Sequence, residues 1–371
     1  MAQDSEPASR VVLIGGGHTH SLVLHAMRQR PLINAAVTVI NPGRTAPYSG
    51  MLPGFVAGHY SRAALDIDIA QLCNDVGARF IDGRATAMDP DSRMVLLEDG
   101  AALPYDLASF DVGITSAMPR IPGFADHGVP AKPLGIFAER WDAYRKEAGA
   151  KSVAVIGGGI AGAELAMAMA YALRHVQNTT IRLIDRSGIL ADNSDTARKN
   201  VRAELDRNGV EVIERAPVRE VIPGGVMIEG GTTIEANFVV GAAGATPHPW
   251  IARTGLDLHH GYIKVDKALR ASLAGISATG VYAVGDCAHL VDNPRPKAGV
   301  YAVREAPVLF ENLHRALAGS PPQDYVPQSD YLKLVSLGGK RAFGEKFGIG
   351  FSGGLVWRLK DHIDRKFMNQ F

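Results

Sequence analysis

Two stretches of the chain share one pattern of apolar and polar residues. Each begins with four apolar residues, at 11–14 and 153–156, and each run leads directly into three glycines. An apolar helical pattern follows, and then a second apolar run that ends at residue 41 or 185. Continuous apolar runs are typical of buried parallel strands, and strand, glycine turn, helix and strand make a βαβ unit. The pattern therefore predicts two similar βαβ units.

Shorter strand patterns lie between and after these units. The segments 80–115 and 210–244 contain short apolar stretches separated by turn residues, which predict small β-meanders. Residues 281–288 predict one more buried strand, and residues 298–313 predict an apolar helix. The alternation of strands and helices indicates an α/β chain.

Composition narrows the classes of protein that this chain could represent. The net charge is +1, so no overall field favours binding to nucleic acid. No apolar run reaches the roughly 18 residues of a spanning helix, and the first ten residues lack the apolar core of a signal peptide. The two cysteines, Cys73 and Cys287, are far apart in sequence, which argues against a disulfide framework. We expect a cytoplasmic protein, free in solution or peripheral on the inner face of the plasma membrane.

The second glycine turn has the full G-x-G-x-x-G spacing, with Gly157, Gly159 and Gly162. Such glycines form a tight turn, let backbone N–H groups approach a pyrophosphate, and allow the helix to pack on the strand. Asp185 ends the next strand, where its carboxylate can accept hydrogen bonds from ribose hydroxyls and repel a 2′-phosphate. Arg186 beside it weakens this preference for NADH over NADPH. The alternative is a glycine-rich packing turn in an unrelated α/β unit.

The first turn keeps Gly15 and Gly17, but His20 stands where the third glycine would be. The third position mainly sets the packing of helix on strand, so a dinucleotide can still bind. Asn41 replaces the usual acidic ribose partner and can still hydrogen-bond a hydroxyl group. Three histidines lie in this turn and helix, but no carboxylate or cysteine cluster completes a zinc site. We expect no metal, and a hydrogen bond from His18 to a phosphate.

Together with a late strand that ends in Gly-Asp, 281-VYAVGDCA-288, the two turns resemble the pyridine nucleotide-disulfide oxidoreductase superfamily. The resemblance runs from Val11 over nearly the whole chain, and it implies that the first unit binds FAD and the second NAD(P)H. It also implies that Asp286 contacts the FAD ribitol. The expected fold is α/β, with two Rossmann-like, three-layer ββα domains and a C-terminal segment. The expected limits are 1–115 with 275–325 for the FAD domain, 116–274 for the NAD(P)H domain, and 326–371 for a C-terminal interface or membrane-association segment.

The branch of the superfamily follows from the residues expected near the flavin. Disulfide reductases and sulfide:quinone oxidoreductases use cysteines there, whereas 47-PYSGMLPG-54 contains none. Cys287 resembles a small filler residue of relatives, and we interpret it as structural. What remains resembles the type II NADH dehydrogenase branch, which passes electrons from NADH through FAD to quinone. The likeness is strongest to the flavoprotein module fused to selenide, water dikinase, and is carried by GGGHTH, PYSGMLPG, 294–307 and 357–368.

The resemblance singles out two residues for hydride transfer. In relatives, the counterpart of Glu164 lies near the nicotinamide, where it can orient the carboxamide. The alternative is an acid that the helix dipole favours at a helix N-terminus. Lys297 precedes a helix whose N-terminus faces the flavin pyrimidine in relatives, where a positive charge would stabilise the anion formed on reduction. Here the alternative is an exposed, solvated lysine.

The resemblance implies contacts to both cofactors along the chain, and Glu164 and Lys297 are the candidate catalytic residues among them. The FAD contacts are Gly15, Gly17, His18, Thr19, Asn41, Arg44, Pro47, Tyr48, Ser49, Ala85, Thr115, Ser116, Gly285, Asp286, Lys297 and Gly299. The NAD(P)H contacts are Gly157, Gly159, Ile160, Ala161, Gly162, Glu164, Asp185, Arg186 and Gly244.

The charge and apolar pattern of the C-terminal segment help to indicate which kind of electron acceptor the protein uses. From residue 333 to 371, eight Lys/Arg and three Asp/Glu give a net charge of +5. One apolar helical stripe is expected there, formed by Val356, Leu359, Ile363 and Phe367. A basic amphipathic helix is typical of membrane-surface contact. Packing on the flavin domain or on a homodimer partner is the alternative.

Three hypotheses for the function follow. The leading one is an FAD-dependent NAD(P)H dehydrogenase that passes electrons to a quinone-type acceptor. The second is a soluble FAD-dependent reductase of a small, selenium- or sulfur-related molecule. It is favoured because Val300 and Arg304 replace two glutamines found near the quinone pocket of type II dehydrogenases. The third is a redox-sensing flavoprotein that binds a partner, and the complete second turn with Glu164 argues against it.

Overall fold

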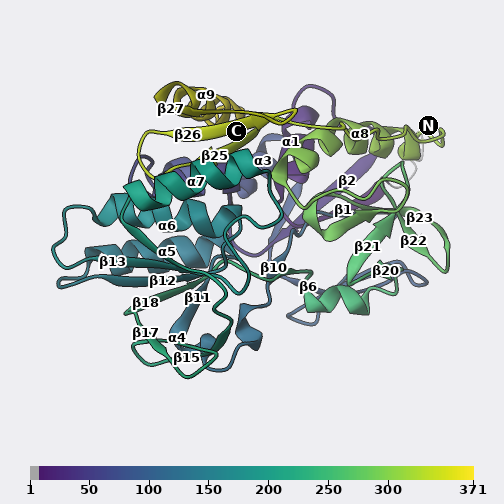
Figure 1. The fold of residues 1–371 in the computed structure, drawn as a ribbon. Coiled ribbons are helices and arrows are strands. Elements are labelled where there is room, and N and C mark those ends of the chain that lie inside the picture. Colours follow the sequence, from purple (N-terminus) through teal and green to yellow (C-terminus); the bar gives the residue numbers. More distant parts are fainter. Residues whose placement is uncertain (1–7) are drawn as a thin grey trace, which may run out of the picture.

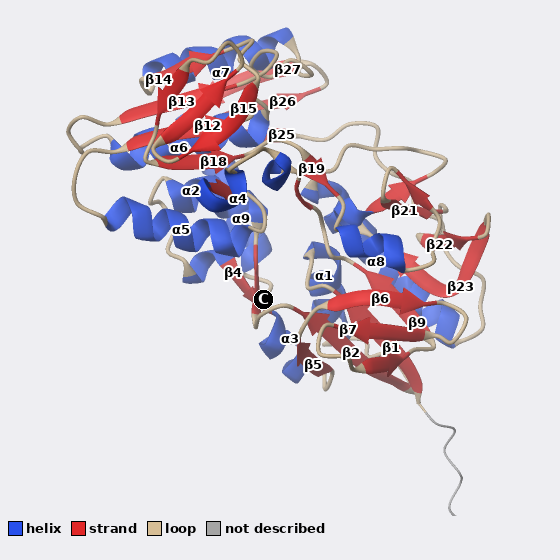
Figure 2. Cartoon of the chain, turned by 90° about the horizontal axis from the view of Figure 1, so that it is seen from below, coloured by secondary structure: helices blue, strands red, loops and turns tan. Residues whose placement is uncertain are grey.

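The computed structural model describes residues 8–371 and contains two large β-sheets. Figure 1 follows the chain by colour, and Figure 2 shows the two sheets in separate lobes when the molecule is seen from below. The chain crosses between the lobes at β10 (Thr115–Ser116) and at β19 (Ala245–Thr246). These short strands pair antiparallel, so the two connections run side by side.

The first sheet has nine strands in the order β20-β21-β22-β23-β9-β1-β2-β5, with β24 beside β21. Its strands are β1 (Ser9–Ile14), β2 (Ala35–Asn41), β5 (Arg79–Asp82), β9 (Leu107–Phe110), β20 (Leu258–His259), β21 (Tyr262–Val265), β22 (Arg270–Leu273), β23 (Ile276–Ala283) and β24 (Ala288–Leu290). Strand β1 lies between β2 and β9 and is parallel to both.

Helices and a meander cover the first sheet. Figure 1 shows α1 (His18–Met27) and α8 (Gly299–Leu317) on one side of the sheet and β6 on the other. The meander consists of β6 (Ala85–Asp89), β7 (Met94–Leu97) and β8 (Ala102–Pro104). Apolar residues of all three layers share one core. The first predicted βαβ unit and the predicted meander are therefore confirmed.

The second sheet has five parallel strands in the order β11-β18-β12-β13-β14. They are β11 (Gly128–Pro130), β12 (Ser152–Ile156), β13 (Thr180–Ile184), β14 (Val210–Ile213) and β18 (Phe238–Gly241). Side chains of β12 alternate between two cores because successive residues of a strand point to opposite faces. Val153 and Val155 pack toward the helices, and Ala154 and Ile156 pack toward a second meander.

The layers of the second domain repeat those of the first. Its helices are α4 (Phe124–His127), α5 (Leu134–Lys146), α6 (Ile160–Leu173) and α7 (Asp195–Arg207). Its meander consists of β15 (Val218–Ile222), β16 (Gly225–Ile228) and β17 (Thr233–Glu235). The prediction of an α/β fold with two three-layer Rossmann-like domains is confirmed. Residues 258–273, which the expected limit at 274 grouped with this domain, form strands of the first sheet instead.

The segment between β2 and β5 reaches across to the second domain. It contains β3 (Thr45–Pro47), α2 (Leu52–Val56), β4 (Asp66–Asp68) and α3 (Ile69–Asp75), with 3₁₀ turns at Ser49–Met51 and Ala63–Leu65. Side chains of α2 are buried in the same core as those of α5 and α6. The indole N–H of Trp141 in α5 donates to the carbonyl of Val56 at 3.1 Å. This contact ties the two domains together next to 47-PYSGMLPG-54.

The C-terminal segment forms β25 (Lys333–Ser336), β26 (Ala342–Lys346), β27 (Ile349–Gly353) and α9 (Gly354–Met368). Its hairpin packs on the second domain, while the end of α9 reaches the first, where Phe371 lies edge-on to His25. Within residues 8–371, no helix is both long and apolar enough to cross a membrane. The 3₁₀ turns at Met118–Arg120, Pro249–Arg253 and Gly285–Cys287 complete the described helical elements.

The expected C-terminal helix is present as α9, but the four apolar residues of its expected stripe differ in exposure. Val356 and Phe367 are buried, but Leu359 and Ile363 are each 40% exposed. The buried stripe contains Lys360 and Asp364 instead, which pair with each other. Sequence spacing missed this because a buried ion pair looks polar when only the sequence is known.

Candidate functional site

The first turn, Gly15–Gly17, leads from β1 into α1. The N–H of Gly15 donates to the carbonyl of Ile40 at 2.8 Å, and its φ of +94° lies in the region that favours glycine. The N–H of Gly16 donates to the side-chain oxygen of Asn41 at 2.9 Å. Gly17 is the N-cap of α1, and because glycine has no side chain, this residue does not cap the helix with a hydrogen bond. The turn thus presents a helix N-terminus at the carboxyl end of the sheet, where anions bind.

Asn41 and Arg44 are held by neighbours in the protein. The side-chain N–H of Asn41 donates to the carbonyl of Gly43 at 2.8 Å, so its oxygen and its nitrogen both have partners. Arg44 pairs with Asp68 of β4 at 3.1 Å. The expected contacts of Asn41 and Arg44 to FAD stay predictions.

The second turn, Gly157–Gly159, has the same pattern of hydrogen bonds as the first turn. The N–H of Gly157 donates to the carbonyl of Ile184, and the N–H of Gly158 donates to a carboxylate oxygen of Asp185 at 2.7 Å. A Cβ atom added at Gly159, the N-cap of α6, would meet no atom within 4 Å. This open space above a helix N-terminus fits a pyrophosphate group.

The residues around the second turn have different surroundings. Ile160 and Ala161 form the first turn of α6, and Ala161 is exposed. A Cβ atom added at Gly162 would overlap the carbonyl oxygen of Gly157, so this glycine allows close packing of helix on strand. Arg186 is exposed beside Asp185. The expected roles of these residues toward NAD(P)H stay predictions.

His20 fills the place of the third glycine in the first unit. It is fully buried, with Nδ1 at 2.7 Å from the carbonyl oxygen of Gly15 and Nε2 at 2.8 Å from the hydroxyl of Ser109. Burial lowers the pKa of this imidazole to about 4, so the ring is neutral. No group of three metal-ligating side chains occurs among residues 8–371. His20 is a packing residue.

Asp111, which the sequence interpretation missed, lies directly behind the first turn. It follows β9, it is only 4% exposed, and its carboxylate accepts the N–H of His20 at 3.0 Å. A Cβ atom added at Gly17 would overlap this carboxyl group. Burial raises the pKa of Asp111 to about 7. Its sequence context, SFDVGIT, contains no signal that would mark it.

The start of α1, the segment after β3 and the start of α8 meet at one place. The ring of His18 lies 5.2 Å from that of Tyr48, which follows Pro47. A Cβ atom added at Gly299 would lie 3.2 Å from His18 and 3.9 Å from the hydroxyl of Ser49. The structure thus brings together several predicted FAD contacts, and the contact of His18 to phosphate stays a prediction.

The Gly285-Asp286 turn lies beside this place. The N–H of Gly285 donates to Glu305 of α8 at 2.6 Å, and Asp286 pairs with Lys132 of the second domain at 3.5 Å. Lys132 was not identified from the sequence. Cys287 is buried with its Sγ 3.2 Å from the carbonyl of Val284, and burial raises its pKa to about 12. A thiol in this state is a poor nucleophile, in agreement with a structural role.

Lys297 is neither fully exposed nor free. Its ammonium donates to the carbonyl of Ala288 and lies 4.2 Å from the ring centre of Tyr262. Burial lowers the pKa of Lys297 to about 8. Thr19 donates to the carbonyl of Ala302 at 2.7 Å, which fixes α1 against α8. The expected effect of Lys297 on the flavin stays a prediction.

Glu164 contacts the C-terminal segment. Its carboxylate accepts the N–H of Ser336 in β25 at 2.6 Å, and burial raises its pKa, an effect that the charge of Lys360 partly offsets. The ammonium of Lys360 donates to the carbonyl of Gly50 at 2.6 Å and to Asp364 at 2.7 Å. The sequence interpretation missed Lys360 and Asp364 as site residues.

Asp364 also connects α9 to the first domain. It accepts the hydroxyl of Tyr48 at 3.2 Å, and burial raises its pKa. The rings of Tyr48 and Phe367 stack at 4.5 Å. The inner face of α9 therefore covers the segment after β3.

The remaining predicted contacts lie on the connecting strands and the meander. Thr115 and Ser116 form β10, and the carbonyl of Gly244 accepts the N–H of Ala117 at 2.6 Å. Ala85 is buried at the start of β6. The structure brings Gly244 next to β10.

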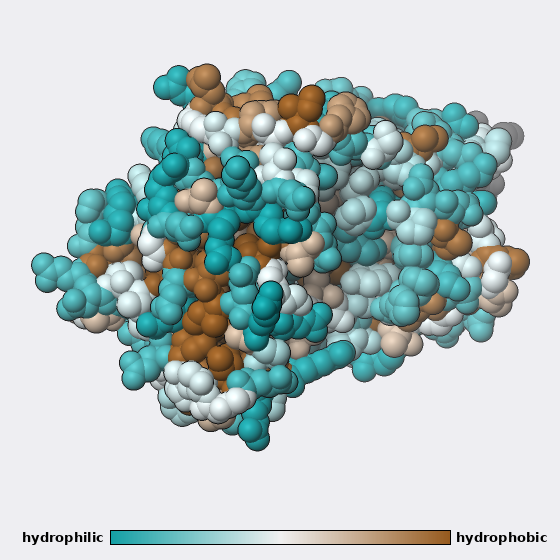
Figure 3. Space-filling view, in the orientation of Figure 1, coloured by the Kyte–Doolittle hydropathy of each residue, from teal (hydrophilic) through white to brown (hydrophobic). Residues whose placement is uncertain are grey.

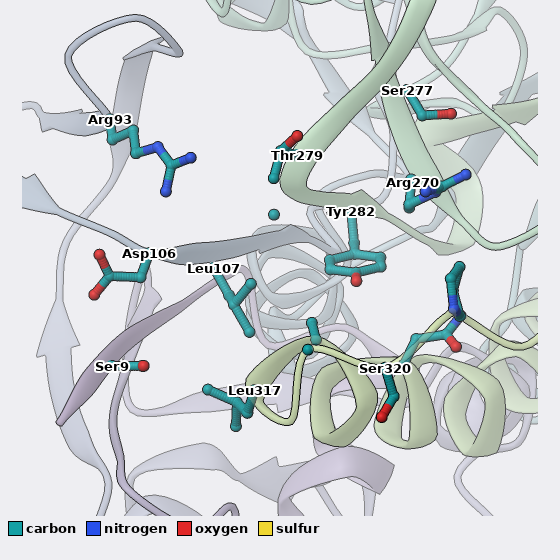
Figure 4. Close-up of a pocket in the computed structure, with 15 residues that line it drawn as sticks. Ser9, Arg93, Asp106, Leu107, Arg270, Ser277, Thr279, Tyr282, Leu317 and Ser320 are labelled. Carbon is teal, nitrogen blue, oxygen red and sulfur yellow. The ribbon is translucent and has the colours of Figure 1, made fainter.

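One surface pocket lies elsewhere. Figure 4 shows it lined by residues at the amino ends of β1 and β9, including Ser9, Asp106 and Leu107, and by Leu317 at the end of α8. Nucleotides bind at the carboxyl ends of parallel strands, which is the opposite edge of this sheet. The pocket is therefore separate from the candidate site.

Comparisons with known proteins agree with this geometry. A family model described as pyridine nucleotide-disulphide oxidoreductase matches residues 9–306. The chain is 25% identical to the NADH dehydrogenase-like protein YutJ of Bacillus subtilis, over 95% of this chain and 99% of that protein. It is 26% identical to demethylphylloquinone reductase NdbB of Synechocystis, over 76% of this chain and 72% of that protein.

A solved structure has the same fold. The sulfide:quinone oxidoreductase of Aquifex aeolicus matches with a TM-score of 0.78 at 16% identity, over 98% of this chain and 92% of that one. The two glycine turns and the Gly-Asp turn meet the needs of two dinucleotides. The chain belongs to the pyridine nucleotide-disulphide oxidoreductase family, in its type II NADH dehydrogenase-like branch, whose cofactors are FAD and NAD(P)H.

Proposed function

We propose that the protein passes electrons from NAD(P)H, through FAD, to a quinone-type acceptor at a membrane surface. The observation that carries this proposal is the position of α9. Its inner face closes over Tyr48 with Lys360, Asp364 and Phe367, while three apolar side chains, Leu355, Leu359 and Ile363, are exposed among basic ones on its solvent side. One helix thus joins the candidate flavin site to a surface that lipid can cover.

The outer surface has the composition of a membrane contact. Leu355 is 78% exposed, and Leu359 and Ile363 follow it at helical spacing on the same side of α9. Phe347 and Ile349 at the β26–β27 turn are also exposed. Figure 3 shows hydrophobic side chains along the upper edge of the molecule, where α9 and β27 lie in Figure 1. Exposed apolar side chains among cationic ones favour an anionic lipid surface.

The inner face of α9 offers groups that can hold protons. FAD, when bound, supplies the two-electron chemistry between the two substrates. Reduction of a quinone to a quinol also takes up two protons. Glu164, whose pKa is raised by burial, can hold a proton, and Lys360 places a positive charge beside it. A buried ion pair such as Lys360–Asp364 contributes little to stability by itself, which supports a functional interpretation.

Two further points support the proposal. The demethylphylloquinone reductase of Synechocystis acts, by its name, on a quinone. The carboxylate of Asp185 at the end of β13 favours NADH over NADPH, because its charge repels a 2′-phosphate.

Anaerobic reduction tests the proposal. NADH is added to the FAD-loaded protein while the flavin absorbance near about 450 nm is followed, and then a ubiquinone analogue or a water-soluble acceptor is offered. We expect bleaching by NADH and rapid recovery with the quinone. Without bleaching, the protein is not a dehydrogenase, and a redox-sensing role would stand. Bleaching without recovery by quinone would leave a soluble acceptor, which the replacement by Val300 and Arg304 favours.

Substitution of Lys360 separates the two half-reactions. In Lys360→Met, we expect NADH to bleach the flavin at a normal rate and the quinone step to slow by about 10- to 100-fold. Lys366→Met, an exposed position on the same helix, is the matched control. Equal quinone rates in both variants would remove Lys360 from the proposal.

Flotation with anionic liposomes tests the membrane surface. The double variant Leu355→Asp/Leu359→Asp should lose binding because charge enters the apolar face. Ile276→Asp, at a position of the first domain that is 72% exposed, should keep it. If the unchanged protein never floats with liposomes, the membrane part of the proposal is wrong.

A further inference from the structure

Asp111 is a buried carboxylate at the place where the FAD site offers its helix N-terminus. Backbone N–H groups of α1, at His20 and Thr19, hydrogen-bond to its side chain. Its carboxyl group touches Gly17 on one side and approaches Gly285 on the other, since a Cβ atom added at either glycine would clash with it or crowd it. A negative group of the protein thus already uses part of the helix terminus that binds an anion.

The second unit has no such group. The N–H of Asp111 donates to Ile14 at the end of β1, and the N–H of Ala242 donates to Ile156 at the end of β12, both at 2.8 Å. The two residues therefore occupy equivalent positions, directly after the strand that pairs with the first strand of each unit. Ala242 leaves the second turn uncharged, whereas Asp111 adds a carboxyl group behind the first.

We propose that the carboxyl group of Asp111 takes up a proton when FAD binds, so that FAD affinity falls as the pH rises. FAD brings a doubly charged pyrophosphate to the turn that Asp111 already contacts. Like charges in a buried place repel strongly, and protonation of the carboxyl group removes this repulsion. The proton comes from solvent, and no other bond is made or broken. The inference rests on FAD binding and not on the identity of the electron acceptor.

Asp111 and Lys297, whose pKa is lowered to about 8, are the two groups near this turn that titrate close to neutral pH. The titratable and charged groups that face Asp111 are His20 of α1, Asp286 and Cys287 of the Gly285 turn, and Glu305 of α8 with its partner Arg295. His20 has a pKa lowered to about 4, and the pKa of Cys287 is raised to about 12, so both are neutral near pH 7.

The two remaining carboxylates near Asp111 are those of Glu305 and Asp286, and they influence its pKa differently. Glu305 is held by Arg295 and by the N–H of Gly285. The charge of Asp286 adds to burial in raising the pKa of Asp111 to about 7. The free protein therefore binds this proton below about pH 7 and loses it above, and FAD binding at higher pH must restore it.

FAD titrations of the apo-protein at several pH values test the proposal. Between about pH 7 and pH 9 the dissociation constant for FAD should rise by up to about tenfold per pH unit. Asp111→Asn keeps an oxygen that accepts the α1 N–H groups and removes the charge. Its affinity for FAD should depend less on pH than that of the unchanged protein, and it should bind FAD more tightly at about pH 9.

Calorimetry in two buffers of different ionisation enthalpy gives a direct count of protons. At about pH 8.5 Asp111→Asn should take up about one proton per FAD fewer than the unchanged protein, because any uptake by Lys297 is common to both. Ser109→Ala is the matched control, because it removes a neutral partner of His20 and leaves Asp111 in place. It should keep the proton uptake.

The second unit provides a test that does not depend on the folding of Asp111 variants. Ala242→Asp places a carboxyl group at the equivalent position, so NADH binding should become weaker as the pH rises. The proposal is overturned if Asp111→Asn shows the same pH dependence and proton uptake as the unchanged protein. It is equally overturned if the unchanged protein binds FAD without proton uptake at about pH 8.5.

Discussion

The two strand–turn–helix units have the same backbone hydrogen bonds, but the space around their turns differs. In the first unit, side chains fill it: Asp111 touches Gly17, and His20 bonds to Gly15. In the second unit, Gly159 has open space around it, and Gly162 lets the helix lie against the turn. An enclosed turn suits a cofactor that stays bound, whereas an open turn suits a nucleotide that enters and leaves in each cycle.

Removal of the charge behind the first turn should have the largest effect on stability. Folding raises the pKa of Asp111 from about 4 to about 7, so the proton is bound more tightly in the folded state. This stabilisation is complete below about pH 4 and is lost as the pH rises through about 7. At about pH 8, Asp111→Asn should therefore be more stable in the apo-form, by up to about 4 kcal/mol.

Urea unfolding of the apo-protein measures this difference. The two proteins should converge toward about pH 4, where Asp111 is protonated. A constant difference at all pH values would mean that the charge of Asp111 is not its cause.

A smaller effect, this time a loss of stability, is expected when the second turn is crowded like the first. Gly162→Ala places a methyl group against the carbonyl oxygen of Gly157, and overpacking of this kind costs about 3 kcal/mol. Gly159→Ala, three residues away, should cost less than about 1 kcal/mol, because its Cβ atom meets nothing. Urea midpoints of the two variants give the comparison, and equal losses would contradict the packing described for this turn.

The smallest change is expected in coenzyme preference. Asp185→Asn gives the second unit the residue type that Asn41 has in the first. Loss of the charge should shift the ratio of NADPH to NADH affinity by about tenfold in favour of NADPH. Dissociation constants for both coenzymes measure this ratio. An unchanged ratio would mean that Arg186 already decides the preference.

Local patterns predicted most of the fold. The apolar runs and glycines identified both βαβ units, and the turn residues identified the meanders, because these signals lie within short stretches of sequence. The expected domain limit at residue 274 grouped strands β20–β22 with the second domain, although they belong to the first sheet. Strands of two to four residues carry little sequence pattern of their own.

The site was predicted less completely than the fold. Gly157, Gly159 and Asp185 follow a known spacing, but Asp111, Lys132 and Lys360 reach the site from distant parts of the chain. Nothing adjacent to these three residues marks them, since tertiary packing alone brings them to their partners. The burial of Lys360 and Asp364 in α9, while Leu355 stays exposed, has the same origin.

One variant directly tests the claim that the first turn binds FAD and the second turn binds NAD(P)H. Gly159→Val fills the open space of the second turn and leaves the first turn unchanged. The variant should purify with a full complement of FAD. On anaerobic addition of NADH, its absorbance near about 450 nm should stay that of oxidised flavin while the unchanged protein bleaches. Bleaching of the variant at the normal rate would contradict the assignment of the second turn to NAD(P)H.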